Sequence, residues 1–244
     1  MASIEPAARG RRLIAIPILL LVAASAACSR RVPTLVPPSC EVEAVEGFAS
    51  ASIAGTEASV KGKFGFVFRK SGLGRVEAID PIGRTAFILL FREGRAWFVL
   101  PGRKVYAEDV AGVMMERFLG VALDPREAVL MLSGTWGRGA TRPELEPGDD
   151  VLFADDVWGL TNDAQGRVVG GVHESFTFEV KSFFPGDAVP REIDLRGMKR
   201  GTSGRIRVLE LAFNPEPREA AFDPAFLRAY APKTWDEVLE LLDR

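Results

Sequence analysis

Hydrophobic and polar positions alternate with a period of two from about residue 42 to residue 107. The alternation is clearest in the segment VKGKFGFVFRK, where apolar side chains dominate one face and Lys61, Lys63 and Arg69 lie on the other. This pattern predicts an antiparallel strand with one apolar face. Similar segments follow after short turns and indicate a meander of strands, and they read GRVEAID, RTAFILLFR and RAWFVLP.

Two helices are predicted in the middle of the chain. The first is indicated by apolar residues at helical spacing, which are Val110, Val113, Met114 and Phe118. It ends at Gly120. The second begins at Asp124, which can cap the helix, while Pro125 fits the first helical position and Glu127 completes a capping-box pair. It runs through AVLML and ends near Gly134.

Strand patterns resume after a loop at 134–150 that is rich in Gly, Pro and charge. They read VLFADDVWGL, GRVVGGV, SFTFEV, PREIDL and GRIRVLELAF. Near the end of the chain, Thr234 and Glu237 form a further capping-box pair, and an apolar stripe begins at Trp235. A final helix is therefore expected there.

The chain is thus mainly β with inserted helices, and we expect a long antiparallel sheet of about ten strands. Open sheets of this size tend to curl, and the two mid-chain helices can cover the apolar inner side of a curled sheet. A cavity between the sheet and these helices is the natural place for an apolar ligand. The residues expected to line it are Phe64, Phe66, Phe68, Val76, Phe87, Leu89, Phe98, Met114 and Phe118.

The N-terminus has the three-part layout of a secretory signal peptide over residues 1–27. Three arginines precede the apolar run LIAIPILLLVAA, which is too short for a transmembrane helix, and small residues then lead to Cys28. This junction resembles the lipobox of bacterial lipoproteins, in which the cysteine is acylated and becomes the mature N-terminus. Ser25 stands where that motif usually has Leu. An ordinary signal peptide followed by a chance cysteine is the alternative.

Composition limits the possible partners of the mature chain. Removing 27 of the 244 residues leaves 217, enough for one sizeable domain, and 47% of the residues are hydrophobic. With 31 basic and 33 acidic side chains, no basic excess favours nucleic acid. No second apolar run is long enough to span a membrane, so a lipid on Cys28 would be the fixed anchor. Residues 28–41 form a Pro-rich linker, in which Cys40 has no disulfide partner if Cys28 carries lipid.

The candidate chemistry favours binding over catalysis. His173 is the sole histidine, no set of metal-ligating residues surrounds it in the sequence, and no serine lies in a nucleophile-elbow motif. Four acidic residues lack the ligand order of an EF-hand and are interpreted as solvated turn residues, which are Asp149, Asp150, Asp155 and Asp156. A hydrolase has no support beyond these residues. We expect no catalytic residue, no metal and no cofactor.

The segment Asp80-Pro81-Ile82-Gly83 has the composition of a tight turn. Asp suits the first position, Pro presets φ at the second, and Gly suits the fourth. Ile82 is unusual at the third position, because an apolar side chain at a turn tip points into water and buries little surface. Either it meets an apolar partner there, or it folds back over the rim of the sheet.

The stretch from Gly74 to Gly134 resembles the outer-membrane lipoprotein receptor family LolB. The DPIG turn after a strand is similar to the N/D-P-x-G turn of that family. The sequence FLGVAL, between the two helices, is similar to its L-x-G-x-x-L/I-type link. Weaker similarity extends from about 43 to 214, and residues 215–244 form a C-terminal extension beyond the expected end of the family's domain.

The resemblance implies a half-open antiparallel β-barrel with an α-helical lid over residues 42–214. Such a domain would hold acyl chains of lipoproteins delivered by a soluble periplasmic carrier and release them into the outer membrane. An apolar residue at the turn tip is linked to membrane delivery in that family, and Ile82, flanked by Pro81 and Gly83, takes this position. The resemblance also implies a lipid anchor at the periplasmic face of the outer membrane. We expect a monomer.

Two alternatives stay open at this point. A lipid carrier or sensor of the same fold would hold a phospholipid or another apolar molecule, with no lipoprotein partner. The extension at 215–244 could close the mouth of the cavity, or it could mark a subfamily with a different ligand.

Overall fold

The computed structural model describes residues 32–54, 59–80, 82–136, 151–152, 158–173, 176–186, 188–198, 202–216 and 218–242. The described residues from Thr34 onward belong to one compact unit. The expected signal peptide, Cys28, Pro81 and the four acidic residues Asp149, Asp150, Asp155 and Asp156 lie outside the described residues.

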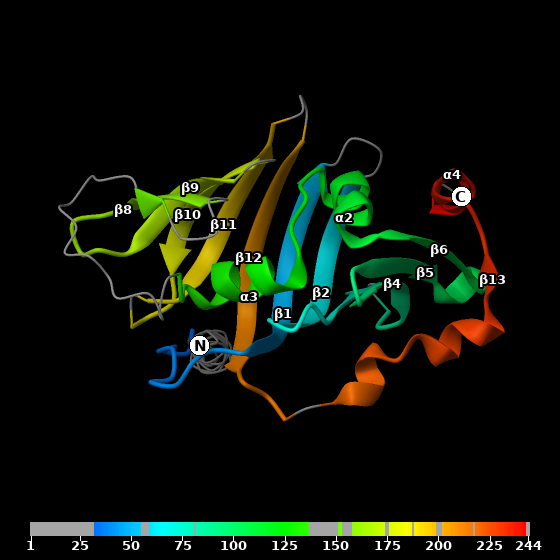
Figure 1. Cartoon of the computed structure of the whole chain (residues 1–244), viewed down its shortest axis with the longest axis horizontal. Helices are drawn as coiled ribbons and strands as arrows, with labels where there is room; N and C mark the ends of the chain where they lie inside the picture. The colour runs from blue at the N-terminus through cyan, green and yellow to red at the C-terminus, as the bar shows by residue number, and fades with distance from the viewer. Residues whose placement is uncertain are drawn as a thin grey trace, which may run out of the picture. The chain divides into compact units, whose positions relative to one another are not determined.

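One sheet of thirteen strands runs through the described residues (Figure 1). Its strands are β1 (Ala44–Ala54), β2 (Ser59–Arg69), β3 (Gly74–Ile79), β4 (Thr85–Arg92), β5 (Arg95–Leu100), β6 (Val105–Val110), β7 (Val151–Leu152), β8 (Trp158–Asn162), β9 (Val168–His173), β10 (Phe176–Phe183), β11 (Pro190–Gly197), β12 (Ser203–Phe213) and β13 (Ala231–Pro232). They lie in the order β13-β6-β5-β4-β3-β2-β1-β12-β11-β10-β9-β8-β7. Neighbouring strands are antiparallel except β13 with β6, which confirms the meander.

The sheet is open, because its edge strands β13 and β7 do not pair with each other. The expected half-open antiparallel barrel with a helical cover is therefore confirmed, although it has more strands than the ten expected. The segment VLFADDVWGL contributes two strands, β7 and β8, instead of one. Strand β6 was not expected, because Glu108 and Asp109 interrupt its apolar alternation, and β13 has only two residues.

Two helices cover one face of the sheet. In Figure 1, α2 (Ala111–Leu119) and α3 (Pro125–Ser133) lie in front of β1, β2 and β12. We call the covered face the inner face, and it carries the buried phenylalanines of β2. Lys61 and Lys63 lie on the opposite, outer face of the same strand.

Local signals explain where these helices begin and end. Asp124 Oδ1 accepts a hydrogen bond from Glu127 N at 2.8 Å, and Glu127 Oε2 accepts one from Asp124 N at 2.8 Å. The predicted capping box is therefore confirmed. Gly120 and Gly134 follow the two helices with φ of 71° and 66°, a left-handed conformation that glycine adopts without steric cost.

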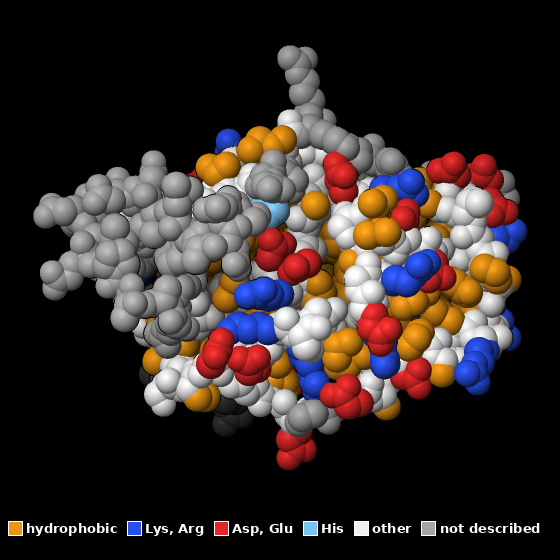
Figure 2. Space-filling model, viewed as in Figure 1, with side chains coloured by type: hydrophobic (Ala, Val, Ile, Leu, Met, Phe, Trp, Pro, Cys, Tyr) orange, Lys and Arg blue, Asp and Glu red, His pale blue; other side chains and the backbone are white. Residues whose placement is uncertain are grey.

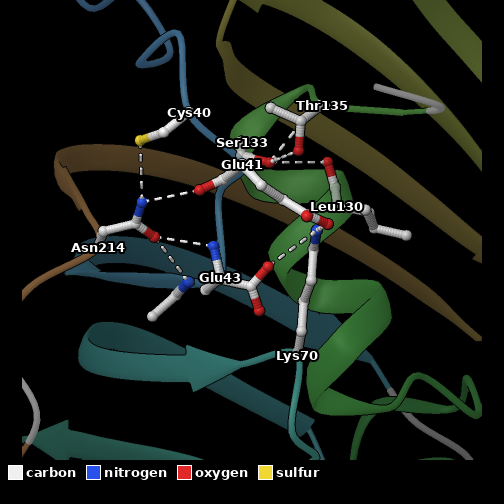
Figure 3. A network of polar contacts seen from close by, with 9 residues as sticks. Cys40, Glu41, Glu43, Lys70, Leu130, Ser133, Thr135 and Asn214 are labelled. Carbon is white, nitrogen blue, oxygen red and sulfur yellow. Dashed lines mark hydrogen bonds and ion pairs between the residues drawn. The ribbon is translucent and has the colours of Figure 1, made fainter. Parts of the chain in front are cut away.

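The chain that precedes β1 is fastened to the end of β12 (Figure 3). Asn214 Oδ1 accepts hydrogen bonds from the backbone N–H groups of Glu43 and Ala44, at 2.8 and 3.2 Å. Its Nδ2 donates to the carbonyl oxygen of Glu41 at 2.9 Å and to Cys40 Sγ at 3.6 Å. The thiol of Cys40 is free and exposed. The Pro-rich linker is thus held to the sheet at its C-terminal end.

The chain after β12 wraps one edge of the sheet. A short turn, η1 (Pro101–Arg103), joins β5 to β6, and the later elements are η2 (Glu219–Phe222), η3 (Pro224–Ala229), β13 and α4 (Trp235–Leu242). On the outer face, Leu227 packs with Ile88 and Val99. Beyond β13, the ring of Trp235 lies 5.4 Å from that of Phe98 on the inner face. The C-terminal extension therefore covers the β6 edge from both sides.

Candidate functional site

An apolar cavity of about 90 Å³ lies between the inner face of the sheet and helices α2 and α3. Six of the nine residues expected to line such a cavity do so, and these are Phe64, Phe66, Phe68, Val76, Leu89 and Phe118. Every lining side chain is a hydrocarbon or a thioether. No described residue beyond β12 lines the cavity, so the described part of the C-terminal extension does not close it.

The other three expected residues are buried next to the cavity and do not line it. The ring of Phe118 lies 5.1 Å from Phe87 and 5.3 Å from Phe98, and these last two rings stack at 5.0 Å. Met114 is fully buried on α2. These side chains form the packed core that continues from the cavity toward β5.

Ten further lining residues were missed by the sequence interpretation, and these are Ala49, Ala51, Ile53, Met115, Leu119, Leu123, Ala128, Met131, Leu132 and Ile206. The three from β1 alternate with serines in the segment ASASI, but alanine gives only a weak apolar signal. On α3, positions 128, 131 and 132 share one side of the helix. Helical periodicity, applied to α3 as it was to α2, could have found that group.

The cavity is too small for a long acyl chain in the observed structure. Ligand pockets usually measure about 300–1,000 Å³, and a buried cavity of about 150 Å³ can hold benzene. At about 90 Å³, this cavity is smaller than either of these volumes, so a site for a larger ligand at this place would be closed in the observed structure. A long chain can enter only if α2 and α3 move away from the sheet.

Different contacts hold the two covering helices. At the start of α3, Glu127 Oε1 lies 2.8 Å from Nε2 of His173 on β9. Helix α2 packs through Met115 and Phe118, and the flexible methionine side chain adapts to a changed surface more easily than a branched one. Gly120, directly after α2, is a position where the backbone can change direction.

His173 is a packing and hydrogen-bonding residue in this structure. It is buried, its ring stacks on Phe176 at 4.8 Å, and the ring of Trp158 lies 4.6 Å away. Among the residues that the structure describes, no group of three or more His, Cys, Asp or Glu side chains could hold a metal ion.

The turn between β3 and β4 presents an apolar side chain to solvent. Gly83 N donates to Asp80 O at 2.9 Å, and Gly83 has a φ of 85°. Asp80 Oδ1 accepts from the backbone N–H groups of Ile82 and Arg84, at 3.0 and 2.8 Å. The hydrogen bond from Arg84 N is the main cause that lowers the pKa of Asp80. Ile82 is 73% exposed, so its side chain does not fold back over the sheet.

The outward side of α2 also carries apolar side chains. Val113 on α2 is exposed, as is Val110, the last residue of β6 directly before the helix, and Figure 2 shows hydrophobic side chains at the surface over this helix. An exposed apolar surface on a covering helix is suited to contact with a partner. In the described part of the chain, no helix has the length and apolar character needed to cross a membrane.

No protein-family model matches the chain, and no curated protein matches it. Three solved structures are similar in part. An outer membrane lipoprotein-sorting protein domain from Vibrio parahaemolyticus has 11% identity and a TM-score of 0.48, over 76% of this chain and 92% of that one. A DUF1329 family protein from Desulfovibrio piger has 10% identity and a TM-score of 0.45, over 76% and 92%. A LolA superfamily protein from Nitrosomonas europaea has 11% identity and a TM-score of 0.45, over 77% and 93%.

TM-scores this low assign the chain to none of these families. None of the three proteins is described as a LolB protein. The cavity and the turn are therefore the features of this chain that bear on its function.

Proposed function

We propose that this chain is a lipid-anchored periplasmic protein that binds acyl chains of lipoproteins beneath α2 and α3 and inserts them into the outer membrane. The observation that carries the proposal is the cavity, because all of its lining side chains are apolar. A polar ligand group buried there without a hydrogen-bond partner would cost about 1–3 kcal/mol. Hydrocarbon chains are the ligand class that fits this lining.

Uptake and release require the energies of the closed and loaded forms to be close. Each methylene buried contributes about 0.8 kcal/mol, so ten methylenes contribute roughly 8 kcal/mol. Opening the helical cover removes contacts of Met115, Phe118 and Met131, which at about 1.5–3 kcal/mol each cost a similar amount. An acyl chain that replaces these contacts is therefore held without being trapped, as a delivery protein requires.

The turn at Ile82 is the part of the domain that we assign to membrane delivery. Burial of its side chain contributes about 1.5–3 kcal/mol, which is too little to hold a protein on a membrane. Acyl chains on Cys28, at about 0.8 kcal/mol per methylene, would supply the stable attachment. Pro81 and Gly83 would fix the tip so that Ile82 enters the bilayer only transiently, while a soluble periplasmic carrier supplies the cargo.

Mass spectrometry of the molecules that co-purify with the protein tests this proposal. The wild-type chain is compared with Ala51→Phe, which places a ring in the cavity, and with Ala212→Phe, which makes the same change at an exposed alanine of β12. We expect triacylated protein with the wild type and with Ala212→Phe, and its loss with Ala51→Phe.

Two other outcomes decide against parts of the proposal. Free phospholipid in place of triacylated protein, lost in the same variant, would identify a lipid carrier without a lipoprotein client. Equal co-purification with all three chains would show that the cavity is not the binding site.

A further inference from the structure

A groove of about 1120 Å³ on the outer face carries basic side chains that the proposed function leaves unused. It runs from β12 across β1, β2 and β3 and reaches the β3–β4 turn, where Asp80 and Gly83 line it. Ala51 and Phe64 line both this groove and the cavity under α2 and α3.

The strand register explains why this groove is basic and why short side chains lie along its centre. Ser50 of β1 pairs with Lys63 of β2 on one side and with Arg207 of β12 on the other. Residues directly opposite one another on adjacent strands share a face of the sheet, so two long cations flank a short hydroxyl side chain. The next outward-facing row repeats this arrangement with Lys61, Ser52 and Arg205.

Some of these cations are neutralised within the protein and others are not. Arg205 makes ion pairs with Asp194 at 2.7 Å and with Glu192 at 3.6 Å. Within the described residues, the groove cations that form no ion pair are Lys61, Lys63 and Arg207. The groove therefore presents an excess of positive charge next to serine hydroxyl groups.

Exposed apolar side chains border the same groove. Phe48 is 46% exposed and Ile79 is 36% exposed, and both line it. Ile82 projects from the turn at its end. Cations that bind phosphate, together with apolar side chains that enter the region of the acyl chains, match a phospholipid surface better than an acidic protein.

We propose that this groove docks on an anionic membrane surface and binds lipid phosphate groups through Lys61, Lys63 and Arg207. The inference rests on the proposed function in one respect, because it assumes that the neighbouring turn meets a membrane. It adds an orientation: the outer face of β2, β1 and β12 lies on the bilayer, and α2 and α3 on the other face remain accessible to a carrier.

Vesicle binding by the mature chain, residues 28–244 with Cys28→Ala, tests the inference, because this chain has neither the apolar signal peptide nor the acyl anchor. Vesicles of phosphatidylcholine alone are compared with vesicles that also contain phosphatidylglycerol. We expect binding to the anionic vesicles that weakens with salt. Lys61→Gln with Lys63→Gln should lower the partition coefficient roughly thirtyfold, since each basic residue near an anionic surface contributes about 1 kcal/mol.

The matched control is Arg92→Gln with Lys181→Gln, which removes the same charge from ion pairs outside the groove. It should retain binding, and melting temperatures should show that all variants fold. Equal loss of vesicle binding in both double variants would show that only net charge matters and would overturn the inference. Equal binding of the unsubstituted groove to neutral and anionic vesicles would also overturn it.

An Ile82→Asp variant separates this inference from the proposed function. Loss of vesicle binding in Ile82→Asp, with normal binding by the lysine variant, would leave the delivery turn standing and reject the groove. The opposite pattern would support the groove and reject membrane entry by the turn.

Discussion

At the scale of single residues, Phe66 and Ile82 show that similar apolar side chains have different roles in this sheet. Phe66 is buried and lines the cavity, whereas Ile82 is exposed at a turn tip. An aspartate should therefore destabilise the fold at Phe66 and leave it intact at Ile82.

Ile82→Asp should leave the fold intact and impair delivery. A turn tip contributes little to the core, so the free energy of unfolding should change by no more than about 0.5 kcal/mol. Transfer of lipoprotein to liposomes should fall sharply, because a carboxylate must be desolvated to enter the bilayer interface. Thermal unfolding and a transfer assay measure the two effects. Lost stability with normal transfer would contradict the assignment of the turn.

Phe66→Asp should be severely destabilising. Removal of a buried Phe side chain alone costs about 3–5 kcal/mol, and the unpaired carboxylate adds a desolvation cost. Val67→Asp is the matched control, because Val67 is only partly buried on the outer face of the same strand. Denaturant unfolding of both variants checks the difference, and a similar loss for each would refute the assignment of faces.

At the scale of elements, the C-terminal extension acts as a cover for the β6 edge. It pairs β13 with β6 and places α4 over the inner face, where Trp235 is buried against Phe98. An exposed edge strand is a template for aggregation, and this cover removes part of it.

Trp235→Ala should destabilise the chain by about 3–5 kcal/mol, because it leaves a large void beside Phe98. Asp236→Ala, on the exposed side of α4, is the control and should change stability by less than about 0.5 kcal/mol. Chemical denaturation measures both. If Trp235→Ala unfolds like the control, α4 does not contribute to the core.

The cap of α4 should give a pH-dependent contribution. Glu237 accepts hydrogen bonds from Lys233 and from Thr234 N, which lower its pKa from 4.5 to about 2. A carboxylate with a depressed folded-state pKa stabilises the fold above its unfolded pKa and loses this effect as the pH falls through the folded value. The melting temperature of wild type should therefore exceed that of Glu237→Gln near pH 6, and the difference should shrink between about pH 4.5 and 2. A constant difference across this range would disprove the role of the carboxylate.

Elements with strong local signals could be predicted from the sequence, and elements defined by partners could not. The capping box at Asp124 and Glu127 and the alternation of β2 are local, and both appear in the structure. Strand β13 exists because Ala231 and Pro232 meet β6, a strand far away in the sequence. Such pairing has no periodic signal of its own.

At the scale of the whole sheet, the cavity follows from the pairing of β1 with β12, which joins the half of the sheet that ends at β13 to the half that ends at β7. The sequence indicated an apolar inner face, but it did not indicate which of the inner-face side chains pack together and which line a cavity. The size of the cavity could not be predicted either, because its volume depends on how closely α2 and α3 pack against the sheet. The same pairing places Lys63 and Arg207 on either side of Ser50.

Site-specific photocrosslinking tests whether acyl chains bind beneath α2 and α3. A benzophenone-bearing residue replaces Phe66 on the inner face or Val67 on the outer face, and each chain is irradiated with a labelled triacylated lipopeptide. We predict crosslinking from position 66 and not from position 67, with competition by unlabelled lipopeptide. Equal crosslinking from both positions, or crosslinking from position 67 alone, would contradict it.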